Sequence, residues 1–130
     1  MAEDGYPEEL RYHPEHDWAR VEGEDATFGV TWHAQDALGE IVFYEPPEVG
    51  AEVTKDQAYA EVESVKAVSD VYAPLSGEIV AVNDALSDRP ELINEDPYGE
   101  GWLVRVRFAD PAEVDRLLDA EAYRKLLKQS

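Results

Sequence analysis

The sequence contains no cysteine, which excludes disulfides and thiolate metal sites made by the protein itself. Any redox chemistry of sulfur would have to come from an attached group. No apolar run approaches the roughly 20 residues that a membrane-spanning helix needs. The first ten residues have neither a secretory signal pattern nor the composition of a transit peptide. We therefore expect a cytoplasmic protein with no membrane partner.

Basic residues are also scarce. The chain has 11 lysines and arginines against 30 aspartates and glutamates, for a formal net charge of −19. This charge repels nucleic acid phosphates and anionic membranes, so nucleic acid is excluded as an expected partner. Basic protein surfaces would be attracted instead. A salty or hot habitat would also explain the acidity, and composition does not separate the two explanations.

The length of 130 residues fits one domain over residues 1–130, and the 44% of hydrophobic residues suffices for a compact core. The acidic residues 1–10 are expected to form a flexible N-terminal extension. The sequence between this stretch and the C-terminus reads mostly as short strands broken by turn residues.

Alternating apolar and polar residues over 17–30 predict two strands joined at Gly23. The residues expected in the core of this hairpin are Trp18, Val21, Ala26 and Phe28. A short helix should follow, capped by Thr31 and closed by Gly39 in the left-handed conformation. Residues 41–45 then read as another strand.

Two runs of alternating residues flank Lys66 and predict a second hairpin. In the first run, the side chains expected on one face are Ala58, Ala60 and Val62, and those on the other are Tyr59, Glu61 and Glu63. After Lys66 the extended pattern continues to Pro74, and a turn at Gly77 precedes the next strand. Turns and glycines are arranged alike on both sides, so Lys66 lies near the centre of a weak internal repeat.

The remaining sequence combines a loop, a strand and two helices. Residues 89–102 are dense in turn residues and are predicted to form an ordered loop. The strand after this loop is predicted to have one solvent-exposed face. Helices are predicted within 111–128, the first with Asp110 as N-cap and Glu113 at the capping-box position. The whole pattern predicts a mainly β barrel or sandwich with a short helical tail.

Lys66 lies at a predicted tight turn between rigid strands, with the small residues Ser64 and Ala67 beside it. An exposed and rigidly presented lysine suits covalent attachment of a cofactor arm. The alternative is an ordinary surface lysine. The hairpin pattern alone leaves both interpretations open.

Three longer stretches resemble the glycine cleavage H-protein family. Residues 63–83, "ESVKAVSDVYAPLSGEIVAVN", are similar to its lipoyl-attachment segment. Residues 13–50 resemble the N-terminal region of that family, and residues 90–103 resemble its characteristic loop before the last strand. The similarity runs from about Tyr12 to the C-terminal helices, so it covers nearly the whole chain.

The resemblance implies a lipoyl-domain-like, flattened barrel of two antiparallel sheets that carries lipoate covalently on Lys66, flanked by Ser64, Val65 and Ala67. Such a protein is a carrier rather than an enzyme. It would take an aminomethyl group from glycine decarboxylase (P protein) to aminomethyltransferase (T protein), and electrons to dihydrolipoyl dehydrogenase (L protein). A lipoyl or octanoyl transferase, or a lipoate ligase, would modify it.

The resemblance also implies a cleft for the loaded arm, where an acidic residue holds the aminomethyl ammonium. Asp17 matches the acidic position of the family's "HEW" motif, although the family more often has Glu there. Asp70 matches another polar position near the arm. Glu15 and His33 are further candidates for this cleft. For each carboxylate the alternative is a solvated surface group, and for His33 it is packing.

Other motifs have weaker functional interpretations. His13 and His16 lack a third ligand at metal-site spacing and are predicted to be surface residues. The three tryptophans are expected in the core or in cleft walls; they are Trp18, Trp32 and Trp102. No nucleophile, histidine and acid form a credible catalytic set.

Two alternatives to the carrier function stay open. An octanoyl or lipoyl relay to other lipoate-dependent complexes would use the same Lys66. An unmodified protein-interaction module would keep only the fold. A biotin carrier is disfavoured because such hairpins place methionine beside the lysine, and the only methionine here is Met1.

Overall fold

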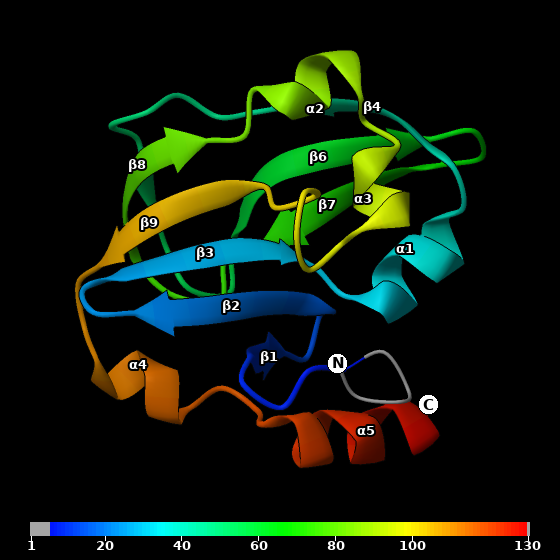
Figure 1. The fold of residues 1–130 in the computed structure, drawn as a ribbon. Coiled ribbons are helices and arrows are strands. Elements are labelled where there is room, and N and C mark those ends of the chain that lie inside the picture. The colour runs from blue at the N-terminus through cyan, green and yellow to red at the C-terminus, as the bar shows by residue number, and fades with distance from the viewer. Residues whose placement is uncertain (1–5, 130) are drawn as a thin grey trace.

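The computed structural model describes residues 6–129 and consists of two antiparallel sheets with short helices around them (Figure 1). The larger sheet contains, in spatial order, β1 (Arg11–His13), β2 (Asp17–Glu22), β3 (Asp25–Val30), β9 (Val104–Phe108), β8 (Gly77–Val82) and β5 (Glu52–Val53). The smaller sheet contains β4 (Ile41–Glu45), β6 (Ala58–Ser64) and β7 (Val68–Tyr72). The predicted mainly β fold of two antiparallel sheets is confirmed.

The helices are short and lie at the ends of the sheets. They are α1 (Trp32–Leu38), α2 (Ala85–Asp88), α3 (Leu92–Glu95), α4 (Ala112–Asp115) and α5 (Ala120–Lys128). Thr31 caps α1, because its hydroxyl accepts a hydrogen bond from the Ala34 N–H, and Gly39 closes the helix with φ of 83°. Both predicted ends of this helix are confirmed. Among the described residues, no helix has the length and apolar character needed to cross a membrane.

The main core lies between the two sheets. The larger sheet contributes residues such as Phe28 and Ile79, and the smaller sheet contributes Val62 and Val71; all four are almost completely buried. Burial of such a side chain stabilises the fold by about 1.5–3 kcal/mol. This core keeps the two sheets at a fixed distance, so the hairpin of β6 and β7 starts from a rigid base.

A second, aromatic cluster joins the first described residues to α5. Its buried members are Tyr6, Leu10, Tyr12, Trp18, Tyr98, Ala120 and Tyr123. The rings of Tyr12 and Tyr123 stack with centroids 4.7 Å apart. Residues 1–5 lie outside the described part of the chain, but Tyr6 and Leu10 are buried. The flexible extension stays a prediction, although Tyr6 and Leu10 pack into this cluster beside α5.

Two β-strand residues depart from the predicted alternation. Val21 is exposed rather than in the core, because β1 pairs only with the first half of β2 and leaves its end uncovered. Tyr59 packs against the core on the same side as Ala60, because the pairing of β6 with β7 contains an irregularity between Ala58 and Ala60. A bulge adds one residue to a strand and so reverses the facing of the residues after it.

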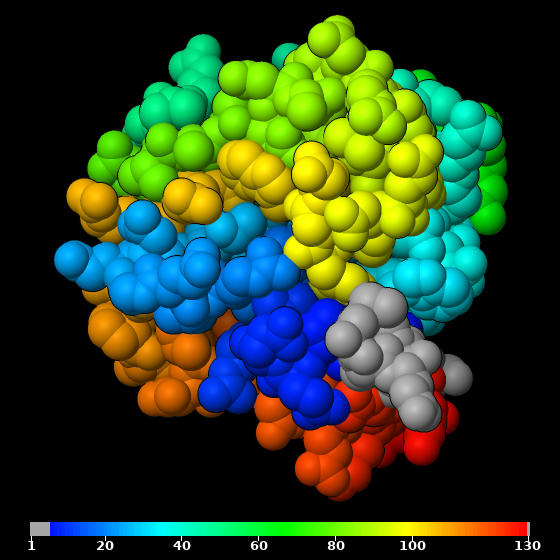
Figure 2. All heavy atoms as spheres, viewed as in Figure 1, coloured from blue at the N-terminus to red at the C-terminus, as the bar shows by residue number. Residues whose placement is uncertain are grey.

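The loop predicted for residues 89–102 contains a helix, α3, and α2 lies just before it. Figure 2 shows this segment, in yellow and yellow-green, filling the space between the β2–β3 hairpin and the segment of α1. Gly77 is the first residue of β8 and not a turn residue; the bend lies at residues 74–75. A Cβ on Gly77 would come within 2.2 Å of the Arg107 carbonyl oxygen, so only glycine fits this strand pairing.

Glu113 does not form the predicted capping box. Its carboxylate instead accepts hydrogen bonds from the Ser76 N–H at 2.8 Å and the Ser76 hydroxyl at 3.0 Å. Asp110 does accept a hydrogen bond from the Ala112 N–H. The Glu113 carboxylate therefore pairs with the Ser76 N–H, a backbone donor just before β8 that would otherwise have no partner.

Candidate functional site

Lys66 lies in the turn that closes the β6–β7 hairpin, and its side chain is exposed. Ser64 holds this turn. Its main-chain N–H donates to the Ala67 carbonyl at 2.8 Å, and its hydroxyl accepts from the N–H groups of Lys66 at 3.3 Å and Ala67 at 3.1 Å. Figure 1 shows the hairpin loop at the edge of the molecule, beyond α1. The turn is thus both accessible and internally bonded.

The loop between α1 and β4 supports this turn from the side. The Glu40 carbonyl accepts a hydrogen bond from the Val65 N–H at 3.0 Å. The side chain of Lys66 runs over Gly39: a Cβ at residue 39 would lie 3.5 Å from the lysine Cε. The lysine side chain therefore lies against this loop.

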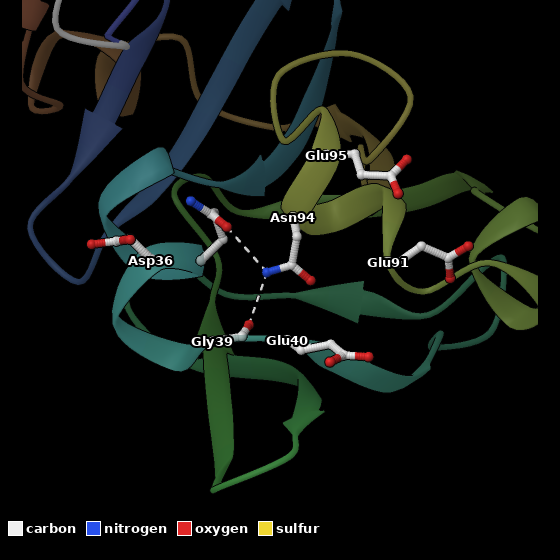
Figure 3. A pocket seen from close by; sticks show the side chains of 7 residues that line it. Asp36, Gly39, Glu40, Glu91, Asn94 and Glu95 are labelled. Atoms are coloured by element: carbon white, nitrogen blue, oxygen red, sulfur yellow. Dashed lines mark hydrogen bonds between the residues drawn. The ribbon is translucent and has the colours of Figure 1, made fainter.

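Asn94 of α3 fixes the α1–β4 loop (Figure 3). Its amide oxygen accepts from the Ile41 N–H at 2.8 Å, and its amide nitrogen donates to the Gly39 carbonyl at 2.8 Å and the Gln35 side chain at 3.0 Å. No local sequence pattern marks Asn94, because it joins groups more than 50 positions away. A run of bonds thus leads from α3 through the loop to the lysine turn.

A cleft of about 290 Å³ lies beside β7 and α1. All four cleft candidates line it, namely Glu15, Asp17, His33 and Asp70. Its apolar wall consists of Val30, Ala34, Ala37, Leu38 and Val71. The cleft combines acidic groups with an apolar wall, which is the environment that a short aliphatic chain ending in a cation requires.

Asp17 is the most unusual group in the cleft. It is only 2% exposed, and its Oδ2 atom has no hydrogen-bond partner among the described residues. Burial raises the pKa of Asp17 well above its usual range; a backbone hydrogen bond from Tyr72 opposes this shift, and the negative charge of Glu15 adds to it. A buried acid with a free oxygen can receive a cationic donor, so the residues present fit an amine-bearing arm.

His16 also lines the cleft, although it was predicted to be a surface residue. Its backbone has φ of 75°, and its Nδ1 atom is 2.8 Å from the hydroxyl of Tyr123. The ring of His33 lies 4.5 Å away. Burial lowers the pKa of His16, and the nearby His33 lowers it further, so His16 is neutral at neutral pH. The left-handed backbone turns this side chain inward, and periodicity does not reveal such a turn.

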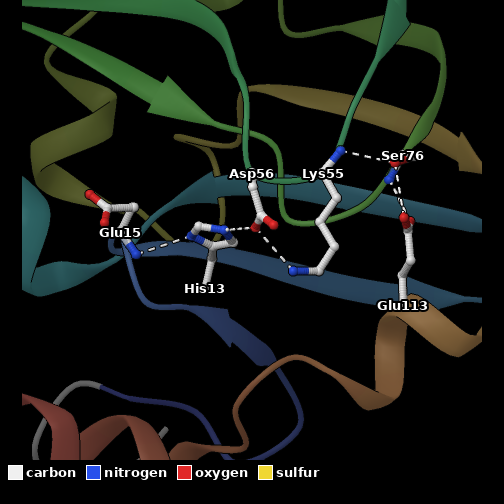
Figure 4. A network of polar contacts seen from close by, with 6 residues as sticks. All are labelled: His13, Glu15, Lys55, Asp56, Ser76 and Glu113. Atoms are coloured by element: carbon white, nitrogen blue, oxygen red, sulfur yellow. Dashed lines mark hydrogen bonds and ion pairs between the residues drawn. The ribbon is translucent and has the colours of Figure 1, made fainter.

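His13 is likewise buried, where sequence analysis predicted a surface residue (Figure 4). Its Nε2 atom lies 2.6 Å from Asp56 Oδ1, and its Nδ1 atom accepts a hydrogen bond from the Glu15 N–H at 3.0 Å. Hydrogen bonds from His13 and Lys55 lower the pKa of Asp56. His13 therefore fixes the backbone at the rim of the cleft, and no group of three metal ligands exists among residues 6–129.

The three tryptophans occupy different environments. Trp18 is fully buried, and its indole N–H donates to the Pro97 carbonyl at 3.0 Å. Trp102 packs against the aromatic cluster. Trp32 is 44% exposed and does not line the cleft, so its prediction as a core or wall residue is wrong.

Comparison with known proteins agrees with this geometry. A family model described as "Glycine cleavage H-protein" matches residues 10–130. The chain is 55% identical to the glycine cleavage system H protein of Halorhodospira halophila over 122 residues, which cover 93% of this chain and 94% of the relative. It is 53% identical to that of Symbiobacterium thermophilum, over 95% of this chain and 96% of the relative.

A solved structure is also similar. The crystal structure of a glycine cleavage system H protein from Mycobacterium marinum matches with a TM-score of 0.86 and 40% identity, over 94% of this chain and 98% of that chain. The match therefore extends over both sheets and the C-terminal helices, well beyond the lysine hairpin. The chain belongs to the glycine cleavage H-protein family.

Proposed function

We propose that this protein is the lipoylated carrier of the glycine cleavage system and that lipoate is attached to Lys66. The family is one of non-catalytic, lipoate-bearing carriers. The single observation that carries the assignment to Lys66 is its place in an exposed turn that Ser64 and the Glu40 carbonyl hold rigid. The flanking residues Ser64, Val65 and Ala67 give that turn its shape and leave the amine open.

Lys66 supplies a primary amine that forms an amide with the carboxyl group of the cofactor. When bound, the lipoyl group supplies a redox-active disulfide and carries the one-carbon unit of glycine between partner enzymes. The protein contributes position: the bonded turn limits where the arm starts, and the loop at Gly39 limits its direction.

Asp17 has the role of holding a terminal ammonium in the cleft. A cation beside its free oxygen favours the carboxylate, so Asp17 releases its proton and accepts a charge-assisted hydrogen bond. Glu15 and Asp70 add negative potential at the rim. The apolar wall keeps water from the held group. His33 and the neutral His16 are further polar groups that line the cleft.

The partners follow from the family. Its members work with glycine decarboxylase (P protein), aminomethyltransferase (T protein) and dihydrolipoyl dehydrogenase (L protein). The net charge of −19 supports electrostatic steering toward basic docking surfaces. A lipoyl or octanoyl transferase, or a lipoate ligase, is the proposed modifying enzyme. The cytoplasmic location stays a prediction.

The two alternatives are weaker. A relay of octanoyl or lipoyl groups would need only the lysine turn, so the acidic cleft would have no use in it. An unmodified interaction module would not need an open, braced lysine. The carrier function uses the lysine turn and the cleft together, and the names of the relatives agree with it.

The test is the intact mass of the protein co-expressed with a lipoate ligase. We expect one lipoyl increment that maps to Lys66 and is lost in Lys66→Arg. Lys55→Arg is the matched control, since Lys55 also lies at a turn of this chain but pairs with Asp56. An increment on another lysine, or none, would contradict the assignment.

A further inference from the structure

Exposed apolar side chains gather near the lysine turn. The large hydrophobic residues most open to water in the described chain include Val65 at 66%, Val68 at 60%, Phe43 at 52% and Val42 at 41%. All four belong to the turn end of the three-stranded sheet. A large aromatic ring left half in water next to the modification site calls for a function, because proteins rarely leave such clusters uncovered.

An irregularity in β4 produces this exposure. Ile41 pairs with Ser64, and the next pairing joins Phe43 to Glu63, so Val42 is an extra residue on β4. The extra residue leaves Ile41 and Tyr44 buried and turns both Val42 and Phe43 outward. Bulges of this kind re-aim side chains at functional edges. Without it, strict alternation would send one of these two side chains inward.

Strand register then places Phe43 and Val68 in one cross-strand row on the outer face, with Glu63 between them. Cross-strand neighbours lie about 4.5–5.5 Å apart. A small hollow of about 130 Å³ opens along this row, lined by Phe43, Glu45, Glu61, Val62, Glu63 and Val68. We name this surface the Phe43–Val68 face.

Carboxylates surround the Phe43–Val68 face. Glu40, Glu45, Glu61 and Glu63 are exposed, and none of them forms a salt bridge with another residue in the described range. The nearby cation is Lys66, and amide formation at its amine removes that charge. The modified carrier therefore presents an apolar row inside an acidic rim with no compensating cation on the same turn.

We propose that the Phe43–Val68 face is a docking surface for glycine decarboxylase, which presents to it an apolar side chain flanked by lysine or arginine. The complementary charge argues for a basic partner. The loss of the lysine charge argues for an enzyme that acts on the modified carrier rather than for the modifying enzyme. This inference rests on the proposed function and names a contact of that same carrier.

The docking face and the cleft meet along β7, where Glu61 of the hollow pairs across the strands with Asp70 of the cleft. The hollow of the Phe43–Val68 face and the cleft share no lining residue. A partner on the outer face of the sheet would therefore lie next to the rim of the cleft that the arm enters or leaves.

The test compares lipoylated variants as substrates of the glycine decarboxylase of the same organism. Initial rates of glycine-dependent arm loading are measured against carrier concentration. We expect Phe43→Ser and Val68→Ser to raise the KM for the carrier by about tenfold with kcat unchanged, as for central interface residues. Val49→Ser is the matched control: Val49 is as exposed as Val68, at 60%, but lies beyond the other end of β4.

Two double variants, each lacking two carboxylate charges, test the acidic rim of the docking face. Glu45→Gln with Glu61→Gln should raise KM about threefold and weaken its dependence on salt, because rim charges mainly steer association. Glu52→Gln with Glu78→Gln removes the same charge from two exposed, cross-strand paired residues of the other sheet, and should leave the salt dependence as in the wild type.

The outcomes separate the two proposals. Wild-type turnover with unchanged KM in Phe43→Ser and Val68→Ser overturns the docking face alone. Slower lipoylation of these variants with an unchanged decarboxylase KM also overturns it, since the face would then serve the modifying enzyme. A wild-type dimer in solution that Phe43→Ser dissolves overturns it as well. A lipoylated wild type that the decarboxylase does not load overturns the proposed function itself.

Discussion

The hairpins β2–β3 and β6–β7 both end at the surface, but they are closed in different ways. The first closes with a two-residue loop at Gly23 and Glu24, with glycine φ of 64° and no other atoms near enough to touch a side chain there. The second contains no residue with positive φ. Its shape comes from the Ser64 hydroxyl and from the neighbouring Glu40 carbonyl.

The difference indicates what presentation of a lysine requires. A glycine turn follows local backbone preference. The Glu24 carbonyl of this turn also accepts one hydrogen bond from the Phe108 N–H, at 3.2 Å. The lysine turn is part of a bonded chain that runs through the α1–β4 loop to Asn94 of α3. The first turn is thus shaped mainly by a glycine with positive φ, and the second by hydrogen bonds from a side chain and from the neighbouring loop.

The largest expected effect comes from moving the lysine between the two turns. In a Lys66→Arg background, Glu24→Lys places an exposed lysine at the tip of the β2–β3 hairpin. We expect no lipoylation of this variant, because the modifying enzyme requires the braced geometry. Intact mass after co-expression with a lipoate ligase measures the result. Modification of residue 24 would show that any hairpin lysine suffices.

Loss of the brace should have the next largest effect. Asn94→Ala removes three hydrogen bonds and leaves the Ile41 N–H without its partner, so we expect a loss of about 2–4 kcal/mol in the free energy of unfolding. Urea denaturation measures this loss. The rate of lipoylation should fall as well, since the loop under Lys66 is freed.

Asn83→Ala is the matched control for Asn94→Ala. Asn83 is buried, whereas Asn94 is half-buried, and the Asn83 side chain also makes three hydrogen bonds, to Glu100, Trp102 and Ala85. It should destabilise the protein to a similar extent without changing the lipoylation rate of the folded protein. Equal slowing in both variants would mean that the brace acts only through global stability.

Asp17 lies where the two hairpins meet, since it begins β2 and its carboxyl group accepts a hydrogen bond from the backbone of Tyr72 at the end of β7. Its pKa is raised in the folded state, so the folded protein favours the neutral acid. Its stabilising contribution is complete below the ordinary pKa of about 3.9 and is lost as the pH rises toward the folded-state pKa.

Asp17→Asn should therefore stabilise the unloaded protein at neutral pH by about 1–3 kcal/mol. The stability difference from the wild type should vanish in acid and grow with rising pH, as thermal unfolding in a pH series would record. The same variant should lose the aminomethyl unit to water faster when loaded. A pH-independent difference would mean that ionisation of Asp17 is not its source.

The smallest effects come from single changes in each turn. Ser64→Ala and Gly23→Ala should each lower the free energy of unfolding by about 1 kcal/mol, the first by loss of turn hydrogen bonds and the second by left-handed backbone strain. Only Ser64→Ala should slow lipoylation, by a few-fold. A slower Gly23→Ala would mean that the two turns are coupled.

Sequence patterns predicted the features that local chemistry determines. The caps at Thr31 and Gly39 and the turn position of Lys66 all follow from residues close in sequence. The exposure of Val21 and the inward packing of Tyr59 were predicted wrongly, because short neighbouring strands and bulges change facing without leaving a mark on the alternation.

Some residues of the candidate site could be identified from the sequence, and others could not. The lysine motif and the acidic cleft residues came from the resemblance, and the structure brings Glu15, Asp17, His33 and Asp70 to one cleft. Asn94 could not be predicted, because its partners are distant in sequence. Nor could His16, because its inward position depends on a left-handed backbone at a residue other than glycine.

The hydrogen bonds of Tyr123 have a consequence for the order of events during synthesis. Its hydroxyl lies 2.8 Å from both His16 and Thr31, so a residue of α5 supports the wall of the cleft and the cap of α1. The β6–β7 hairpin leaves the ribosome well before Tyr123. A nascent chain can therefore form the strands around its attachment lysine before it has a finished cleft, and competence to retain cargo is acquired last.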